Sequence, residues 1–170
     1  MIAAERANGM PIVFLGLMAL VLAGCGDGGP SQGNGPRGVF TSTNDCSTHE
    51  KFDFKSCSKA IRAAIQLHNQ ESPTYESLRF CKASEIGCER TLNNKYRPRL
   101  LGFYVELPEK KDDQIIGKPL YAAATGKKKG FADHKKQQYL DDDLALVFSQ
   151  RAVAVYQANS KTKKSGGFGS

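Results

Sequence analysis

The first clear hydrophobic pattern along the chain is a continuous apolar run near the N-terminus. Pro11–Gly24 holds 14 residues without a charge, behind a short polar head that contains Arg6. A membrane-spanning helix needs about 20 apolar residues, so this run is too short to span a bilayer and is typical of a signal peptide. Residues 1–24 are therefore predicted to be a targeting segment and are left out of the fold prediction.

Helical periodicity follows in the middle of the chain. In Ser58–Asn69 the apolar positions recur at the i, i+3, i+4, i+7 spacing of one helix face, with Ser58 as the predicted N-cap. A second helix is predicted from Ser72-Pro73, an N-cap and first-turn pair, to a stop at Gly87. The short link between them predicts an antiparallel helical hairpin. His68, on the first helix, is predicted to be a half-buried helix residue rather than a ligand.

The second half of the chain favours short strands. Arg99–Leu107 is apolar and aromatic and lies between two prolines, and Leu120–Thr125 is a shorter apolar piece. Leu144–Tyr156 is the strongest β candidate because it is rich in valine and aromatic residues, while an alanine-rich helix stays open as the alternative. The pattern predicts an α+β fold, in which a helical hairpin precedes a few short strands.

Four cysteines lie in or near the predicted hairpin. Cys46, Cys57, Cys81 and Cys88 are separated by 10, 23 and 6 residues. After an export signal an even cysteine count predicts disulfides, and the spacing lacks the C-x-x-C pairs typical of zinc or redox sites. One possible pairing is local, Cys46–Cys57 with Cys81–Cys88, and requires Gly87 to interrupt the second helix. A pairing that crosses the hairpin stays equally open.

The composition adds a basic character. The chain has 24 Lys and Arg against 17 Asp and Glu, a formal net charge of +7. Candidate contacts to an anionic surface are Lys127, Lys128, Lys129, Lys135 and Lys136. The alternative is that these lysines only keep the surface soluble. The glycines flanking the first three do not have the spacing of a phosphate-binding loop, and Asp141–Asp143 lacks the alternating ligands of a calcium loop.

A cysteine follows the apolar run directly. Leu22-Ala23-Gly24-Cys25 resembles the lipobox of bacterial lipoproteins, in which the cysteine becomes acylated after cleavage in front of it. The resemblance implies that the mature chain begins at Cys25 and is held on a membrane by the acyl chains on that residue. An ordinary secretory signal with a chance cysteine is the alternative. The choice between inner and outer membrane stays open, because Asp27 lies one place later than an inner-membrane retention signal would have it.

The domain organisation follows from these segments. Residues 25–38 hold the acylated cysteine and a Gly/Pro-rich tether, whose 13 residues after Cys25 have a root-mean-square span of roughly 20 Å. Residues 39–159 are predicted to form one small cysteine-containing domain. Residues 160–170 are predicted to be a basic, glycine-rich, disordered tail.

Short motifs along the chain suggest a family. They are Val39-Phe40, Asn44-Asp45-Cys46, Cys57, Ser72-Pro73-Thr74-Tyr75, Cys81, Ile86-Gly87-Cys88, Pro98, Gly102-Phe103-Tyr104, Lys118-Pro119-Leu120-Tyr121 and Gly166-Gly167-Phe168-Gly169. In this order, together with the lipobox, the chain resembles the YgiB-like bacterial lipoproteins, whose domain has no assigned function. The later half is more compact and richer in lysine than in that family. The resemblance brings no catalytic residues to this chain.

These observations lead to a functional expectation. We expect a non-enzymatic, lipid-anchored lipoprotein of the bacterial cell envelope that faces the periplasm and has a structural or partner-binding role. The alternative is a basic module that binds lipopolysaccharide, phospholipid or cell-wall polymer. No catalytic residue, cofactor or metal ligand is expected, because H-E-x-x-H and C-x-x-C motifs are absent from the sequence. An unidentified envelope protein or anionic polymer is the expected partner, and nucleic acid is not expected.

Overall fold

The fold is seen in a computed structural model, which describes residues 35–110, 114–123, 130–140 and 143–161. Its helices are α1 (Thr43–Ser47), α2 (Phe54–Glu71), α3 (Leu78–Ser84) and α4 (Gln150–Lys161). Its strands are β1 (Arg37–Phe40), β2 (Cys88–Arg90), β3 (Tyr96–Pro98), β4 (Gly102–Glu106), β5 (Ile116–Ala122), β6 (Gly130–Ala132), β7 (Gln138–Leu140) and β8 (Val147–Phe148). The predicted α+β class is therefore confirmed.

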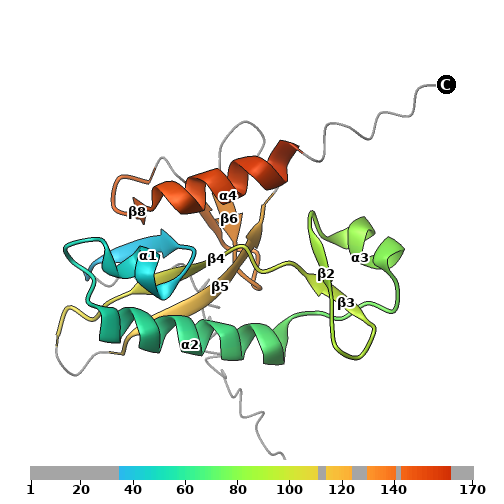
Figure 1. The fold of residues 1–170 in the computed structure, drawn as a ribbon, viewed down its shortest axis with the longest axis horizontal. Coiled ribbons are helices and arrows are strands. Elements are labelled where there is room, and N and C mark those ends of the chain that lie inside the picture. The colour runs from blue at the N-terminus through green and yellow to red at the C-terminus, as the bar shows by residue number, and fades with distance from the viewer. Residues whose placement is uncertain (1–34, 111–113, 124–129, 141–142, 162–170) are drawn as a thin grey trace, which may run out of the picture.

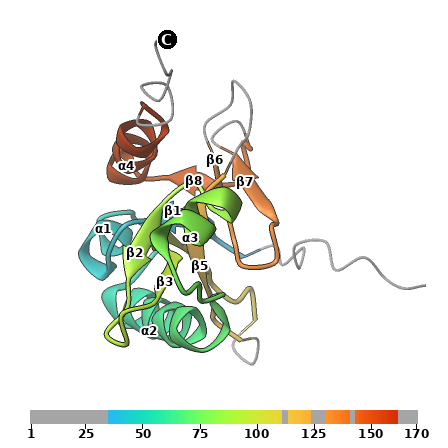
Figure 2. The same cartoon turned by 90° about the vertical axis from the view of Figure 1, so that its right-hand side faces the viewer.

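Six of the strands form one sheet that lies between helices. Their order is β7-β6-β5-β4-β1-β8, and all neighbours are antiparallel except β1 and β8, which are parallel. Helices α1 and α2 cover one face of the sheet, and α4 lies on the opposite face (Figures 1 and 2). The remaining strands, β2 and β3, form a separate antiparallel ribbon beside α3.

Side-chain alternation along the strands builds a core on each face of the sheet. Phe40 of β1 and Phe103 of β4 pack with buried residues of α2, while their neighbours Val39 and Tyr104 pack toward α4. Successive side chains of a strand point to opposite faces, so each strand supplies both cores. Burial on both faces explains why β4 is apolar along most of its length.

Helix α2 confirms the helical periodicity of the sequence but begins earlier than predicted. The side chain of Asp53 accepts a hydrogen bond from the backbone N–H of Ser56 at 3.0 Å and is the N-cap, so the predicted cap at Ser58 is wrong. The buried residues Cys57, Ile61 and Ala64 lie on the face toward the sheet. The extra first turn is held by this cap and by Cys57, which is buried and bonded to Cys46.

The second helix is shorter than predicted, and the helical hairpin is not formed as expected. Its N-cap is Ser77 rather than Ser72, and it ends at Ser84, before Gly87. The chain between the helices is extended, because the backbone of Tyr75 pairs with that of Tyr96. Helix α3 therefore packs against β2 and β3, while α2 lies along β5.

The strand prediction is confirmed for β4, which lies within Arg99–Leu107, but is wrong for most of Leu144–Tyr156. The apolar piece that begins at Leu120 supplies only the end of β5, which starts at Ile116. Within Leu144–Tyr156 only Val147–Phe148 is a strand, and helix α4 begins two residues later. The hydroxyl of Ser149 accepts a hydrogen bond from the backbone N–H of Ala152 at 3.0 Å, which is N-cap geometry. Ala152 and Tyr156 then lie one turn apart and pack on the sheet, so the alanine-rich helix is the correct alternative.

The cysteines form the local pair of disulfides. Cys46 in α1 is bonded to Cys57 in α2, and Cys81 in α3 is bonded to Cys88 in β2, with Cα separations of 6.0 and 6.2 Å. The pairing that would cross the hairpin is excluded. The 81–88 bond is possible because α3 ends at Ser84 and the chain turns before Cys88.

The predicted targeting segment, Cys25 and most of the predicted tether lie outside the described residues. The fold itself begins within the predicted tether, since β1 starts at Arg37. Among the described residues, none of the helices has the length and apolar character to cross a membrane.

Replacing Gly117 by Ala is expected to destabilise the fold. A Cβ atom there would overlap the backbone carbonyl of Ala60, where α2 crosses β5, so the helix must move. We expect the free energy of unfolding to fall by about 1–3 kcal/mol, measured by urea denaturation of the purified protein. The matched control is Gly87→Ala, whose new Cβ meets only the Cβ of Arg99 at 3.6 Å and should be tolerated. Equal losses in both variants would contradict this account of the helix–strand contact.

Candidate functional site

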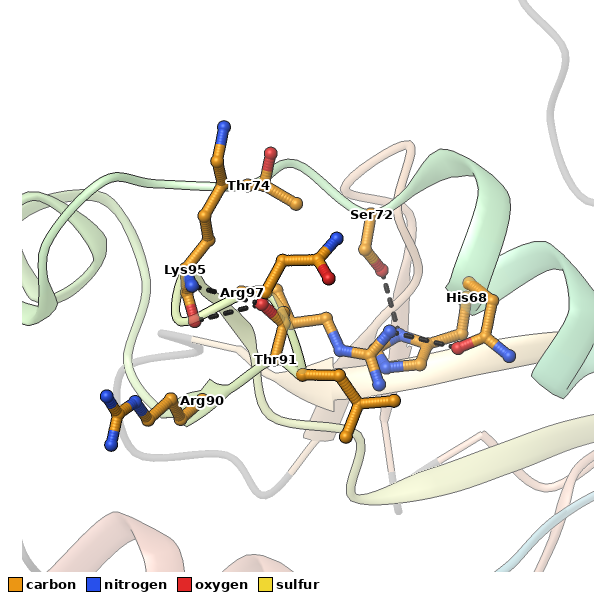
Figure 3. Close-up of a pocket in the computed structure, with 10 residues that line it drawn as sticks. His68, Ser72, Thr74, Arg90, Thr91, Lys95 and Arg97 are labelled. Carbon is orange, nitrogen blue, oxygen red and sulfur yellow. Dashed lines mark hydrogen bonds between the residues drawn. The ribbon is translucent and has the colours of Figure 1, made fainter.

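A polar pocket opens between the C-terminal end of α2 and the β2–β3 ribbon (Figure 3). Its volume is about 630 Å³, within the usual range for small-molecule sites. We call it the His68 pocket. It is lined by His68, Asn69, Ser72, Thr74, Arg90, Thr91, Leu92, Asn93, Lys95 and Arg97.

The floor of the pocket is the last turn of α2. His68 lies one turn beyond Ala64 on the buried face of the helix, and only 2% of its surface is exposed. Ser72 is the C-cap residue, and its backbone N–H donates to the carbonyl oxygen of His68 at 3.3 Å. The helical periodicity that places Ala64 in the core therefore also places the imidazole of His68 on that face, and the hydroxyl of Ser72 follows at the end of the helix.

His68 is the centre of a hydrogen-bond network. Its Nδ1 lies 2.8 Å from the hydroxyl of Ser72 and 2.9 Å from the hydroxyl of Tyr121, and the two hydroxyls are 2.8 Å apart. Its Nε2 lies 3.3 Å from Oε1 of Glu89. In a neutral imidazole one nitrogen donates and the other accepts. The carboxylate of Glu89 assigns the proton to Nε2, which leaves the lone pair of Nδ1 for the two hydroxyls.

Burial keeps this network uncharged at its centre. The pKa of His68 is lowered, mainly because the ring is buried away from water and also because the positive charge of Arg97 is near. Glu89 acts in the opposite direction. Burial also raises the pKa of the Tyr121 hydroxyl. At neutral pH both groups are therefore uncharged, and the imidazole accepts hydrogen bonds through Nδ1.

The wall of the pocket is held by an ion pair across the ribbon. Glu89 and Arg97 are directly opposed in the β2–β3 pairing, and Nε of Arg97 lies 2.7 Å from Oε1 of Glu89. Nη1 of the same guanidinium donates to the side-chain oxygen of Asn69 on α2 at 2.9 Å. Arg97 thus links the ribbon to the helix, and its side chain reaches toward His68 and Ser72 (Figure 3).

Local turn chemistry and a disulfide position the ribbon. Asn94 adopts a left-handed conformation with φ of 60°, which asparagine tolerates better than most residues, and the turn is closed by hydrogen bonds between Thr91 and Lys95. The other end of β2 is bonded through Cys88 to Cys81 of α3. The ribbon is therefore fixed at both ends, with its basic side chains beside the pocket.

The arrangement has the order of a hydroxyl, an imidazole and a carboxylate, but the imidazole contacts two hydroxyls rather than one. A serine nucleophile needs a base dedicated to its proton. Here the single lone pair of Nδ1 is shared between Ser72 and the more acidic hydroxyl of Tyr121. Glu89 is in turn held by Arg97. The chemistry available in the pocket is hydrogen bonding together with positive charge.

The predicted lysine contacts are only partly described. Lys127, Lys128 and Lys129 lie outside the described residues, as does Cys25. Lys135 is exposed in the β6–β7 turn, and the neighbouring Lys136 lies 3.1 Å from Oε1 of Glu85. The described part of this cluster is therefore partly neutralised, and it lies away from the His68 pocket lining.

The other two histidines do not join the pocket. The ring of His49 packs against Phe40, with ring centroids 5.3 Å apart. Nε2 of His134 lies 2.9 Å from Oε2 of Glu71, in an orientation that does not make a hydrogen bond. Within the described ranges no three His, Cys, Asp or Glu side chains cluster as metal ligands would.

A family model described as a protein of unknown function, DUF1190, matches residues 36–170. The chain belongs to the DUF1190 family. The match spans every described helix and strand, so the two disulfides and the His68 pocket lie within the DUF1190 region. Searches of curated proteins and of solved structures gave no match.

Most of the pocket residues of this DUF1190 chain were not singled out by their sequence. Ser72 was expected to begin a helix but ends one. Of the hydrogen-bond partners around His68, Glu89 and its ion-pair partner Arg97 carried no motif, and Tyr121 was named only within a family motif, with no role attached. The pair Asn93-Asn94 is a turn signal. A hairpin centred on Asn93 would have brought Glu89 opposite Arg97, whereas no turn or periodic pattern points to Tyr121.

The lowered pKa of His68 predicts how the stability of the DUF1190 domain depends on pH. The unfolded histidine binds a proton near its ordinary pKa of about 6.5, whereas the folded one does so only at lower pH. Stability should therefore fall as the pH drops below about 6.5 toward the folded pKa. Arg97→Gln should raise the pKa of His68, measured by NMR titration of the imidazole, because one cause of the lowering is removed.

The control for this measurement is Lys95→Gln, which removes the same charge from the rim of the pocket. Lys95 is not among the causes that lower the pKa of His68, so its replacement should leave the titration in place. A pKa of His68 at or above about 6.5 in the unmodified protein, or equal shifts in both variants, would contradict the assignment.

Proposed function

We propose that this protein is a lipid-anchored protein of the bacterial cell envelope, whose DUF1190 domain binds an anionic ligand in the His68 pocket. The observation that carries the binding role is the composition of that pocket. Arg90, Lys95 and Arg97 line it, while the carboxylates of Glu89 and Glu76 pair with two of these cations from beside the lining, which leaves an excess of positive charge. A pocket with this lining favours a ligand that carries phosphate or carboxylate groups.

The guanidinium of Arg97 is the best-placed group for such a ligand. Within the described residues its hydrogen bonds involve Nε and Nη1, which leaves the two N–H groups of Nη2 for an oxyanion. The hydroxyl of Ser72 and the side chain of Asn69 lie beside it in the lining. Because Glu89 and Asn69 hold the guanidinium in place, little conformational entropy is lost when a ligand binds.

The two other cations lie at the rim of the pocket. Lys95 pairs with the exposed carboxylate of Glu76 at 2.9 Å, an ion pair that water weakens. Arg90 is exposed and points away from His68 (Figure 3). These side chains raise the local positive potential and attract an anion, while the buried end of the pocket supplies orientation.

The envelope location is supported by the cysteines together with the N-terminal pattern. Two disulfides are formed in the fold, and such bonds persist in oxidising compartments. The lipobox-like sequence ending at Cys25 and the resemblance to YgiB-like lipoproteins support attachment by acyl chains. A single acyl chain holds only marginally, so stable attachment would need more than one.

We further propose a non-enzymatic role, without a metal or cofactor. The shared lone pair of His68 supports this, because neither hydroxyl beside it has a base to itself. The second candidate function is a basic surface that binds lipopolysaccharide, phospholipid or cell-wall polymer through the lysine cluster. Exposed Lys135 supports it, while the ion pair of Lys136 with Glu85 counts against it.

The anchor predicts a definite mass for the protein extracted from bacterial membranes. We expect cleavage in front of Cys25, added acyl chains and no reaction of the other cysteines with an alkylating reagent, because all four are bonded. Cys25→Ser should abolish acylation and release the protein from the membrane fraction. Acyl chains found on no residue, or alkylation of two or more thiols in unreduced protein, would contradict the proposal.

The pocket predicts that inorganic phosphate and pyrophosphate bind to the purified protein in competition with each other. Arg97→Lys should weaken binding by about tenfold or more, since a charge-assisted hydrogen bond and the planar fork are lost. Isothermal titration calorimetry of both ligands measures this loss. The matched control is Arg79→Lys on α3, the same substitution at an exposed arginine outside the pocket lining. Equal losses in the two variants would contradict the assignment of Arg97 to the binding site.

A further inference from the structure

The outer face of α2 carries three basic residues and two exposed apolar ones. Lys55, Lys59 and Arg62 are exposed and follow the i, i+4, i+7 spacing that places them on one side of the helix. Phe54 and Ile65, 11 residues or about three turns apart, are 59% and 41% exposed and lie along the edge of that side. We call these five residues the α2 outer face.

The charge on this helix has one sign. From Phe54 to Gln70 the helix contains no Asp or Glu, and Glu71 is its last residue. Asp53 lies at the N-cap, where its carboxylate is engaged with Ser56. A basic helix face flanked by exposed apolar side chains is the pattern of a helix that lies on an anionic membrane surface.

The surface also has room for phosphate groups. A shallow depression of about 510 Å³ runs along it, lined by Phe54, Lys55, Ser58, Lys59, Arg62, Ala63 and Gln66. Neither the sheet nor another described helix covers these positions, since the helix buries its opposite side, with Ala60 and Ala64, against the sheet. The basic side chains are therefore available to a surface outside the molecule.

The sheet register places this face close to the point where the chain enters the fold. Gly38 of β1 is paired with Val105 of β4, which is paired with Gly117 of β5, and Gly117 lies directly under Ala60 of α2. Neighbouring strands are about 4.8 Å apart, so Gly38 lies roughly 10 Å along the sheet from Gly117, the residue beneath α2. The entry point is thus well within the reach of the predicted tether from the N-terminal half of α2.

We propose that the α2 outer face docks on the anionic phospholipid surface of the membrane that holds the protein. Lys55, Lys59 and Arg62 contact lipid phosphates, and Phe54 and Ile65 enter the interface. The proposal rests on the lipid anchor for the orientation of the domain and is independent of the His68 pocket. Each basic side chain near such a surface strengthens binding several-fold, so the three together contribute on the order of 100-fold.

The absence of tryptophan from the sequence allows a direct test. Phe54→Trp places a single fluorescent reporter on the α2 outer face. Phe80→Trp, on α3, is the matched control, because Phe80 is 63% exposed and lies on a different part of the molecule. The full chain carrying either substitution is mixed with vesicles of phosphatidylcholine, with or without phosphatidylglycerol. The readouts are the emission maximum and quenching by brominated lipid.

We expect Trp emission at position 54 to shift to shorter wavelength and to be quenched only when phosphatidylglycerol is present. The signal at position 80 should stay unchanged. Salt at about 1 M should reverse the effect, because it screens charges beyond about 3 Å. Replacing Lys55, Lys59 and Arg62 together by Gln should abolish it, whereas the same change at Arg79, Lys82 and Lys135 should not. Equal responses at positions 54 and 80, or none at 54, would overturn the proposal.

Flotation of the same samples separates failure of the anchor from failure of docking. Protein that floats with the vesicles but shows no change at position 54 is anchored without docking, which overturns the inference and leaves the anchor in place. Suppose instead that the full chain purified from membranes carries no acyl group on Cys25 and still shows a phosphatidylglycerol-dependent change at position 54. That result supports docking and contradicts the anchor. Loss of both flotation and the fluorescence change overturns both.

Discussion

The close seating of α2 on β5 is the contact on which the rest of the structure depends. Gly117 has no Cβ, so the backbone of Ala60 can approach the strand directly, and Ala64 continues the small-residue contact along the helix. Because the helix and the strand run in the same direction from this point, His68 arrives above Tyr121. The position of the pocket is thus set by a contact about two helical turns away from it, through backbone rather than through the polar side chains themselves.

A buried carboxylate connects the remaining layer to this frame. Oδ2 of Asp45 accepts hydrogen bonds from the backbone and hydroxyl of Thr41, at 2.8 and 3.0 Å, and from the hydroxyl of Ser149 at 2.6 Å. Ser149 also caps α4, so one carboxylate in α1 fixes the start of a helix 104 residues later in the chain. The cost of burying Asp45 is offset by these three donors. Without these hydrogen bonds, Ser149 would no longer be held as the cap of α4. The edge formed by β1 and β8 would then lose its lateral support.

Local patterns predicted the parts of the fold that local forces determine. The periodicity of α2 and the apolar runs in β4 and β5 can be recognised in the sequence because these residues pack in the core. Tyr75 and Leu144–Tyr156 were misassigned for the opposite reason. The backbone of Tyr75 is extended because it pairs with Tyr96, 21 residues later, and α4 depends on a cap that is itself held by Asp45. The His68 pocket joins separate segments of the chain, so no single local pattern in the sequence marks it as a site.

The two sides of α2 impose different constraints on one segment. The inner side needs small residues near Gly117 and a polar residue at 68, whereas the outer side needs no particular residue for folding. Helix propensity alone would be satisfied there by alternating Lys and Glu, which also supply stabilising i, i+4 pairs. In this helix the charged residues are instead all basic up to Glu71, its last residue, and Phe54 and Ile65 are exposed where a polar residue would be more soluble. Folding does not account for that pattern, whereas contact with an anionic surface does.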